Sequence, residues 1–172
     1  MAVIFQDSFT ESSDTDLDSH TPDVGTSWTN VWQTSSSAKL TVIGSSDVAQ
    51  GNDAGDEGAI YSADATYPSP DYKVSAKINA GYVGGRRLYL IARMADQENM
   101  YALRLTTGAT ATRLYKKVSG TWTAMGSFNT DPSVGDVVTL AVNGSSISYY
   151  YNGVLQDTQT DTSLTSAGHL IA

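Results

Sequence analysis

The residues that could perform acid–base or nucleophilic chemistry are few in this sequence. His20 and His169 are the only histidines, and the chain has no cysteine. A serine hydrolase would need a histidine beside a serine on a sharp turn, yet no Gly-x-Ser-x-Gly motif occurs. Two distant histidines also supply too few nitrogen ligands for zinc. We therefore expect structural roles for both, His20 in a turn and His169 in a strand.

The carboxylates form no recognisable hydrolytic pair either. Cleavage of a glycosidic bond needs two carboxyl groups about 5 to 9.5 Å apart. Almost every acidic residue is Asp, and the only glutamates, Glu11, Glu57 and Glu98, lie in no segment that alternates Glu with Asp. The sequence accordingly predicts no catalytic residues and a protein that is not an enzyme.

Acidic residues gather in two segments that could hold calcium, residues 52–57 and 14–18. Ca²⁺ takes oxygen ligands from carboxylates, amides and backbone carbonyls. The candidate metal ligands are Asp53, Asp56 and Glu57. Neither segment has the spacing of an EF-hand loop, and Asp is also common in solvated turns. A structural calcium and a solvated turn both stay open here, and no other cofactor is expected.

A further set of residues has the chemistry of a binding surface. Alternation along the expected strands directs aromatic and basic side chains away from the core, onto one exposed face if these strands are neighbours. Tyr and Arg are typical of binding hot spots, and aromatic rings can stack on the faces of sugars. The alternative is that long side chains only cover the outer surface of a sheet. The candidate ligand-binding residues are Tyr89, Arg93, Arg104, Arg113, Tyr115 and Tyr150.

Strands must position these side chains, because apolar residues recur at every second position and helical periodicity is nearly absent. Asn143-Gly144 and Asn152-Gly153 predict two-residue hairpin turns. Residues 15–18 predict a short helical turn, and Trp32 is expected on an exposed loop. The expected strands cover residues 3–9, 38–43, 58–62, 71–79, 86–95, 99–106, 110–118, 122–128, 137–142, 147–151, 154–155 and 167–172.

Length and composition fit one all-β domain. The chain of 172 residues is long enough to bury a core without disulfides. We expect a single lectin-like domain over residues 1–172, folded as a two-sheet antiparallel jelly-roll sandwich. A net charge of −8 repels phosphate backbones and anionic lipids, which argues against nucleic acid and membrane surfaces as partners.

Several segments, in this order and spacing, resemble the concanavalin A-like lectin/glucanase superfamily in its laminin-G-like, non-catalytic branch. The resemblance implies a lectin-like sandwich and places Trp28 and Trp122 in its core. Catalytic members carry a Glu-x-Asp-x-x-Glu strand that this chain lacks, so the resemblance implies fold rather than hydrolysis. The segments that carry it are Asp7-Ser8-Phe9, Gly25-Thr26-Ser27-Trp28, residues 72–78, residues 99–105, Leu114 to Trp122, Gly135-Asp136, Leu140, Val142, Gly144, Ile147, Tyr149, Asn152-Gly153, Asp161, Leu164 and Ala167-Gly168.

Two functions fit these observations. The main expectation is a structural protein of a phage virion surface, a capsid decoration or tail protein. It rests on a chain that begins at Met1 without a secretion signal and that resembles lectin-like domains of phage structural proteins. This reading predicts other virion proteins as partners and a homotrimer or capsid-bound form. The alternative is a carbohydrate-binding module or adhesin of a bacterial surface protein, extracellular or on the cell surface, with glycans as partners.

Overall fold

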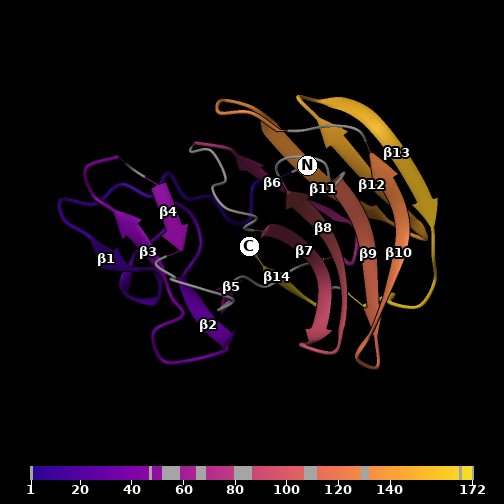
Figure 1. The fold of residues 1–172 in the computed structure, drawn as a ribbon, viewed down its shortest axis with the longest axis horizontal. Coiled ribbons are helices and arrows are strands. Elements are labelled where there is room, and N and C mark those ends of the chain that lie inside the picture. Colours follow the sequence, from indigo (N-terminus) through magenta and orange to yellow (C-terminus); the bar gives the residue numbers. More distant parts are fainter. Residues whose placement is uncertain are drawn as a thin grey trace. The chain divides into compact units, whose positions relative to one another are not determined.

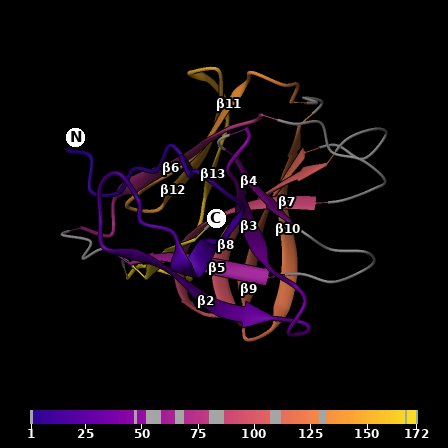
Figure 2. The same cartoon turned by 90° about the vertical axis from the view of Figure 1, so that its left-hand side faces the viewer.

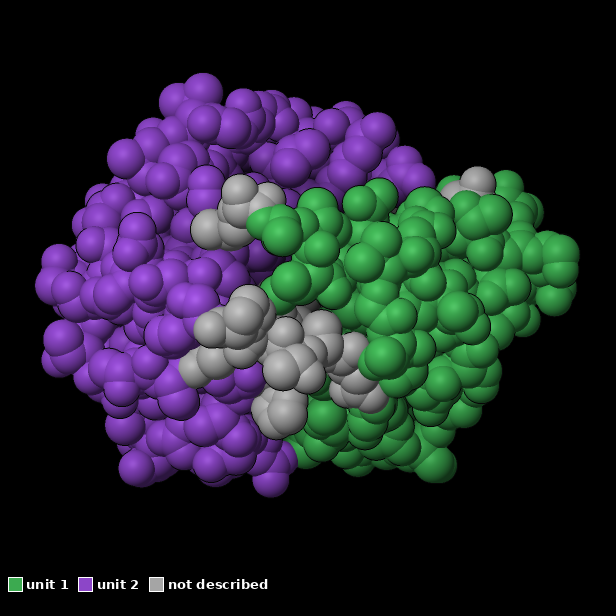
Figure 3. Space-filling model, turned by 180° about the vertical axis from the view of Figure 1, so that it is seen from behind, with its two compact units in different colours: residues 1–67, 171–172 green, residues 68–170 purple. Residues whose placement is uncertain are grey.

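Strands dominate the computed structural model, which describes residues 2–46, 48–51, 59–64, 69–79, 87–106, 112–128, 132–166 and 168–171. The predicted all-β class is confirmed, since one 3-10 turn is the only helical element among these residues. Contacts divide the chain into two compact units, Met1–Tyr67 with Ile171–Ala172 and Pro68–Leu170 (Figure 3). Each unit is described below by itself, and the single domain over residues 1–172 stays a prediction.

The first unit, called unit 1, holds two small groups of antiparallel strands (Figure 1). Strand β3 (Leu40–Ile43) pairs with both β1 (Thr15–Asp16) and β4 (Val48–Gly51). Strand β2 (Ser27–Gln33) lies side by side with β5 (Ala59–Asp64), as Figure 2 shows. The helical turn predicted over residues 15–18 is correct only in part, because Thr15–Asp16 is strand β1 and the 3-10 turn η1 covers Leu17–Ser19.

The predicted strand over residues 3–9 is wrong, because this segment forms only an isolated bridge between Gln6 and Val24. Its aromatic residues serve instead as a cap on Trp28, which is 5% exposed. Phe5 packs edge-on against the Trp28 ring with centroids 4.8 Å apart, and Phe9 stacks on the same ring at 6.0 Å. The core position implied for Trp28 is therefore confirmed.

The second unit, called unit 2, is a sandwich of two antiparallel sheets (Figure 1). One sheet contains, in order, β10 (Thr121–Phe128), β9 (Thr112–Val118), β8 (Asn99–Thr106) and β7 (Arg87–Asp96). The other contains β13 (Val154–Thr160), β12 (Ser146–Tyr151), β11 (Val137–Asn143) and β6 (Tyr72–Lys77). The final strand, β14 (His169–Ile171), includes the boundary between the units.

Alternation decides which side chains fill the core of unit 2. The inner residues of β8, Tyr101, Leu103 and Leu105, are fully buried. Across the sandwich, Phe128 and Tyr149 bring ring centroids to 4.9 Å, so the inner faces of the two sheets meet. The inward directions predicted for β6, β8 and the start of β12 are confirmed, because Val74, Tyr101 and Ile147 are all buried.

The hairpin turns agree with the sequence in one case and differ by one residue in the other. Asn152 and Gly153 have φ of 50° and 78° between the paired Tyr151 and Val154, as a type I′ turn requires. In the β11–β12 hairpin Asn143 pairs with Ser146, so the turn residues are Gly144 and Ser145. Only Gly144 has positive φ there, 54°, which is the pattern of glycine in the first position of a type II′ turn.

Candidate functional site

A shallow hollow of about 210 Å³ lies on unit 2, on the face of the β7–β10 sheet that points away from the sandwich core. Strands β7, β8, β9 and β10 each contribute a side chain to it, so the hollow extends over more than one hairpin. The lining residues are Arg87, Tyr89, Arg104, Tyr115 and Trp122. Tyr89, Arg104 and Tyr115 were predicted from the sequence, and the structure brings them together.

Strand register explains why these side chains meet. Tyr89 on β7 is directly opposite Arg104 on β8, and Arg104 is directly opposite Arg113 on β9. Side chains of directly opposed residues share one face of a sheet and lie about 5 Å apart at Cβ. The next row places Tyr115 between Ala102 and Ala124, whose methyl side chains leave room for the surrounding rings. The predicted position of Arg113 beside Arg104 and Tyr115 is thus observed.

The aromatic side of the hollow is built around Trp122, which is 46% exposed. Tyr115 meets the Trp122 ring edge-on, with centroids 5.8 Å apart and planes at 86°. Tyr89 is tilted against the same ring at 6.1 Å. The core position implied for Trp122 is therefore wrong: the two-residue turn at Ser119-Gly120 pairs Trp122 with Lys117, which lies on the outer face.

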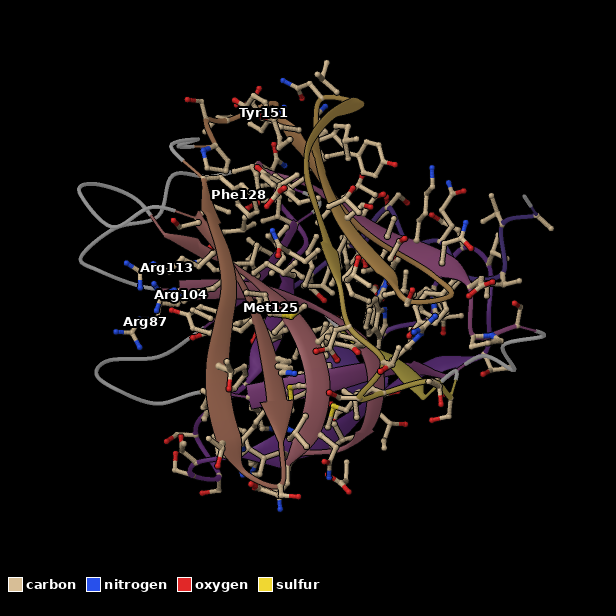
Figure 4. The ribbon with its side chains drawn as sticks, turned by 90° about the vertical axis from the view of Figure 1, so that its right-hand side faces the viewer. Arg87, Arg104, Arg113, Met125, Phe128 and Tyr151 are labelled. Atoms are coloured by element: carbon tan, nitrogen blue, oxygen red, sulfur yellow. The ribbon has the colours of Figure 1, made fainter. Side chains whose placement is uncertain are left out.

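The cationic side of the hollow is formed by arginines. Arg87, Arg104 and Arg113 extend from the same side of the ribbon (Figure 4). The guanidinium carbon of Arg104 lies 5.0 Å from the centroid of the Tyr115 ring, a cation–π contact that restrains its plane. The Nε atoms of Arg104 and Arg113 are buried and have no hydrogen-bond acceptor among the described residues. Neither N–H group is therefore satisfied within the described part of the chain.

Arg93 does not belong to this face, and the outward direction predicted for it is wrong. Its backbone has a φ of 49°, and the β7–β8 register shifts between Ala92 and Asp96, which interrupts the alternation. The side chain is 1% exposed and donates hydrogen bonds to the backbone carbonyls of Pro70, Gly144 and Leu164 and to the Asp71 carboxylate. Arg93 thus connects the chain segments around Pro70, Gly144 and Leu164 by hydrogen bonds.

Tyr150 is also separate from the hollow. It lies on β12 in the other sheet of unit 2, opposite Thr139 and on the face away from the sandwich core. The Lys73 ammonium sits 5.2 Å from its ring centroid. Since the two sheets pack by their inner faces, Tyr150 and the hollow are on opposite sides of unit 2.

The candidate calcium ligands Asp53, Asp56 and Glu57 lie outside the described residues, so their metal site stays a prediction. In the second acidic segment, Asp14 accepts a hydrogen bond from the Gly44 amide and Asp16 pairs with Lys39. Over the ranges that the structure describes, no three His, Cys, Asp or Glu side chains are grouped to hold a metal ion. Nor does any described helix have the length and apolar character needed to cross a membrane.

Sequence reasoning missed Arg87 and the binding-face position of Trp122. Arg87 is two residues before Tyr89, so the same alternation could have found it.

Unit 1 carries a separate open hollow of about 450 Å³ beside Trp32, which is 38% exposed. Trp32 is exposed as expected, but on strand β2 rather than on a loop. The residues around this second hollow are Asp18, Asn30, Val31, Trp32, Gln33 and Lys39.

Comparison with known proteins identifies the fold. No family model and no curated protein sequence matches the chain. Among solved structures, it is similar to the carbohydrate-binding module CBM66 from Bacillus subtilis, with a TM-score of 0.59 and 18% sequence identity over 84% of each chain. The two chains share a fold. At this identity the likeness supports the lectin-like β-sandwich and leaves the superfamily assignment as a resemblance.

Proposed function

We propose that this protein binds carbohydrate in the hollow on the outer face of the β7–β10 sheet. The observation that carries the proposal is the exposed Trp122 ring, held by Tyr115 and Tyr89 beside Arg104 and Arg113, whose Nε–H groups have no acceptor among the described residues. A sugar ring has apolar C–H faces and a polar edge. An aromatic wall with adjacent N–H donors matches both parts, because the ring face packs on the wall and the hydroxyl edge accepts hydrogen bonds.

The shared fold adds support, since the similar solved structure is a carbohydrate-binding module. The residues named as lining the hollow also favour binding over catalysis. They include no Asp, Glu or His, whereas glycoside hydrolysis requires a pair of carboxyl groups. An extracellular or cell-surface location fits such a function.

The direct test is a glycan array followed by calorimetry on the best ligand, with the unaltered protein and Trp122→Ala. We expect Trp122→Ala to weaken binding about tenfold or more, because the aromatic wall is lost. Tyr150→Ala is the matched control, since Tyr150 lies on the opposite side of unit 2. Binding that Trp122→Ala leaves unchanged would move the site elsewhere, and Trp32→Ala would then test the hollow on unit 1.

The virion role has no observation in its favour beyond the sequence, and it stays a prediction together with the homotrimer. Native mass by light scattering tests it, because a capsid decoration protein is expected to assemble at a symmetry axis. A monomer that binds glycans would contradict the virion role and agree with the binding module.

A further inference from the structure

We infer that the ligand of this hollow is an acidic sugar, one that carries a carboxylate or sulfate group. The inference rests on the proposed carbohydrate function and names the ligand class. Its starting point is a contrast in charge. The chain as a whole carries −8, with 18 acidic residues against 10 Lys and Arg. The hollow has two arginines in its lining and a third, Arg113, beside it, and no acidic side chain among its named lining residues.

The register places two of these positive charges directly opposite each other. Arg104 on β8 is the cross-strand partner of Arg113 on β9. Like charges in directly opposed positions destabilise a sheet. The chain has only 10 Lys and Arg residues, yet two of them occupy this pair and Arg87 lines the same hollow. An anion bound between the guanidinium groups would turn this repulsion into attraction.

Four other cations in the described part of the chain have carboxylate partners, one of them Lys39 with Asp16. Arg93 pairs with Asp71, Lys116 with Asp161, and Lys117 with Glu98. By contrast, the Nε–H groups of Arg104 and Arg113 are buried without any acceptor in the described residues. A buried donor to which no acceptor is bonded is costly, and it calls for an explanation such as an absent ligand.

The shape of the arginine side chain narrows the ligand further. A guanidinium is planar and offers paired N–H donors that match two oxygens of a carboxylate or sulfate. The Arg104 guanidinium lies 5.0 Å from the Tyr115 ring centroid, a cation–π contact, and Trp122 lines the same hollow against Tyr115. The arrangement fits a sugar ring on Trp122 with its acidic group directed to Arg104 and Arg113.

The test compares acidic glycans with neutral counterparts. Oligogalacturonate is paired with its neutral methyl ester, sialyllactose with lactose, and a sulfated oligosaccharide with its desulfated form. We expect at least one acidic member to bind about tenfold or more tightly than its neutral partner, with an advantage that shrinks as NaCl is raised. The three pairs separate uronate, sialate and sulfate as the source of the charge.

Variants then assign the preference to the arginines. Arg104→Gln and Arg113→Gln should each reduce acidic-glycan binding about tenfold or more, because a charge-assisted hydrogen bond is lost. Lys77→Gln is the matched control, since it removes the same charge from an exposed side chain of the other sheet. Arg104→Lys keeps the positive charge and loses the paired N–H donors of the guanidinium, so its affinity should lie between those of the unaltered protein and Arg104→Gln. Thermal unfolding of each variant checks that it is folded.

The outcomes separate the ligand class from the function itself. If neutral glycans bind as tightly as acidic ones and folded Arg104→Gln and Arg113→Gln bind normally, the acidic class is overturned while carbohydrate binding stands. If no glycan binds and an acidic peptide does so through the same arginines, both the sugar class and the proposed function are overturned. Arginine-dependent binding of an acidic glycan supports both.

Discussion

Trp122 lies directly opposite Lys117 across the β9–β10 hairpin, and the Lys117 ammonium is 5.6 Å from the centroid of the Trp122 ring. The same lysine pairs with Glu98 at 3.2 Å. A tryptophan at the outer face of a sheet, flanked by a cation rather than by core side chains, can be removed without opening a cavity. A substitution of Trp122 can therefore change ligand binding with little change in the free energy of unfolding.

The first prediction compares two tryptophans. Trp28→Ala should lower the free energy of unfolding by about 3 to 5 kcal/mol, because Trp28 is buried under Phe5 and Phe9. Trp122→Ala should cost roughly 1 kcal/mol or less, since the side chain is half exposed. Urea denaturation followed by circular dichroism measures both. Equal losses would contradict the surface position of Trp122.

The second prediction concerns Arg93. Arg93→Met removes a buried guanidinium that serves three carbonyls and the Asp71 carboxylate, and it should destabilise the fold by about 3 to 5 kcal/mol. Arg87→Met is the control and should change stability by about 0.5 kcal/mol or less, because Arg87 is exposed. Among the folded variants, Arg87→Met should weaken glycan binding more than Arg93→Met does, because Arg87 lines the hollow. A stable Arg93→Met protein that fails to bind would return Arg93 to the binding site.

The third prediction is the acid sensitivity of Asp161. Burial alone would raise the pKa of this carboxyl group, but hydrogen bonds from Lys116 and Tyr101 outweigh it and hold the pKa well below the usual value of an aspartate. The carboxylate therefore contributes stability at neutral pH that is lost as the pH falls below the ordinary aspartate pKa toward the folded value. Asp161→Asn should be less stable than the unaltered protein at pH 7, with a difference that narrows in acid. Denaturation at a series of pH values measures this, and a constant difference would contradict it.

The fourth prediction concerns the alkaline side of the same cluster. Burial and the hydrogen bond to Asp161 raise the pKa of Tyr101 to about 12. A raised tyrosine pKa stabilises the fold below the ordinary pKa of 10.0, and this contribution disappears as the pH rises toward 12. Tyr101→Phe should therefore differ from the unaltered protein most at neutral pH and least in strong alkali. Absorbance of tyrosinate during titration provides an independent readout.

The fifth prediction concerns His20 in unit 1. Its Nε2 atom is 2.8 Å from Asp7 and its Nδ1 atom 2.7 Å from Glu11. Burial alone would lower the pKa of His20, but the two carboxylates outweigh it and raise the pKa above 6.5. The imidazolium therefore stabilises the fold below pH 6.5, and this stability is lost as the pH rises through the folded pKa. His20→Gln should show a flatter stability profile across neutral pH, and NMR titration of His20 would report the raised pKa directly.

Alternation along the sequence was enough to predict most strands of unit 2 and the meeting of Tyr89, Arg104, Arg113 and Tyr115. The reason is that a period of two fixes the face of each side chain, and short turns fix which strands are neighbours. The turns at Asn152-Gly153 and Ser119-Gly120 both have positive φ at both residues, so the register that they set is strict.

Features that depend on distant residues could not be predicted in this way. Arg93 turns inward because of a local register shift, and its hydrogen-bond partners are up to 71 residues away. The strands β2 and β4 were missed because their apolar residues are not regularly spaced: β2 itself has a register shift between Asn30 and Trp32. Residues 3–9 alternate like a strand, yet Phe5 and Phe9 are used to cover Trp28.

The contacts around Trp122 give the protein an optical signal of its own. The Trp122 indole is half exposed, and two tyrosine rings and the Lys117 ammonium lie within about 6 Å of it. Its fluorescence is therefore emitted from a solvated ring. A sugar stacked on the ring would displace the water molecules next to it. Trp28 is shielded under two phenylalanines, so its emission forms a constant background. With Trp32 replaced by phenylalanine, ligand occupancy should be readable as a blue shift in intrinsic fluorescence, without any attached dye.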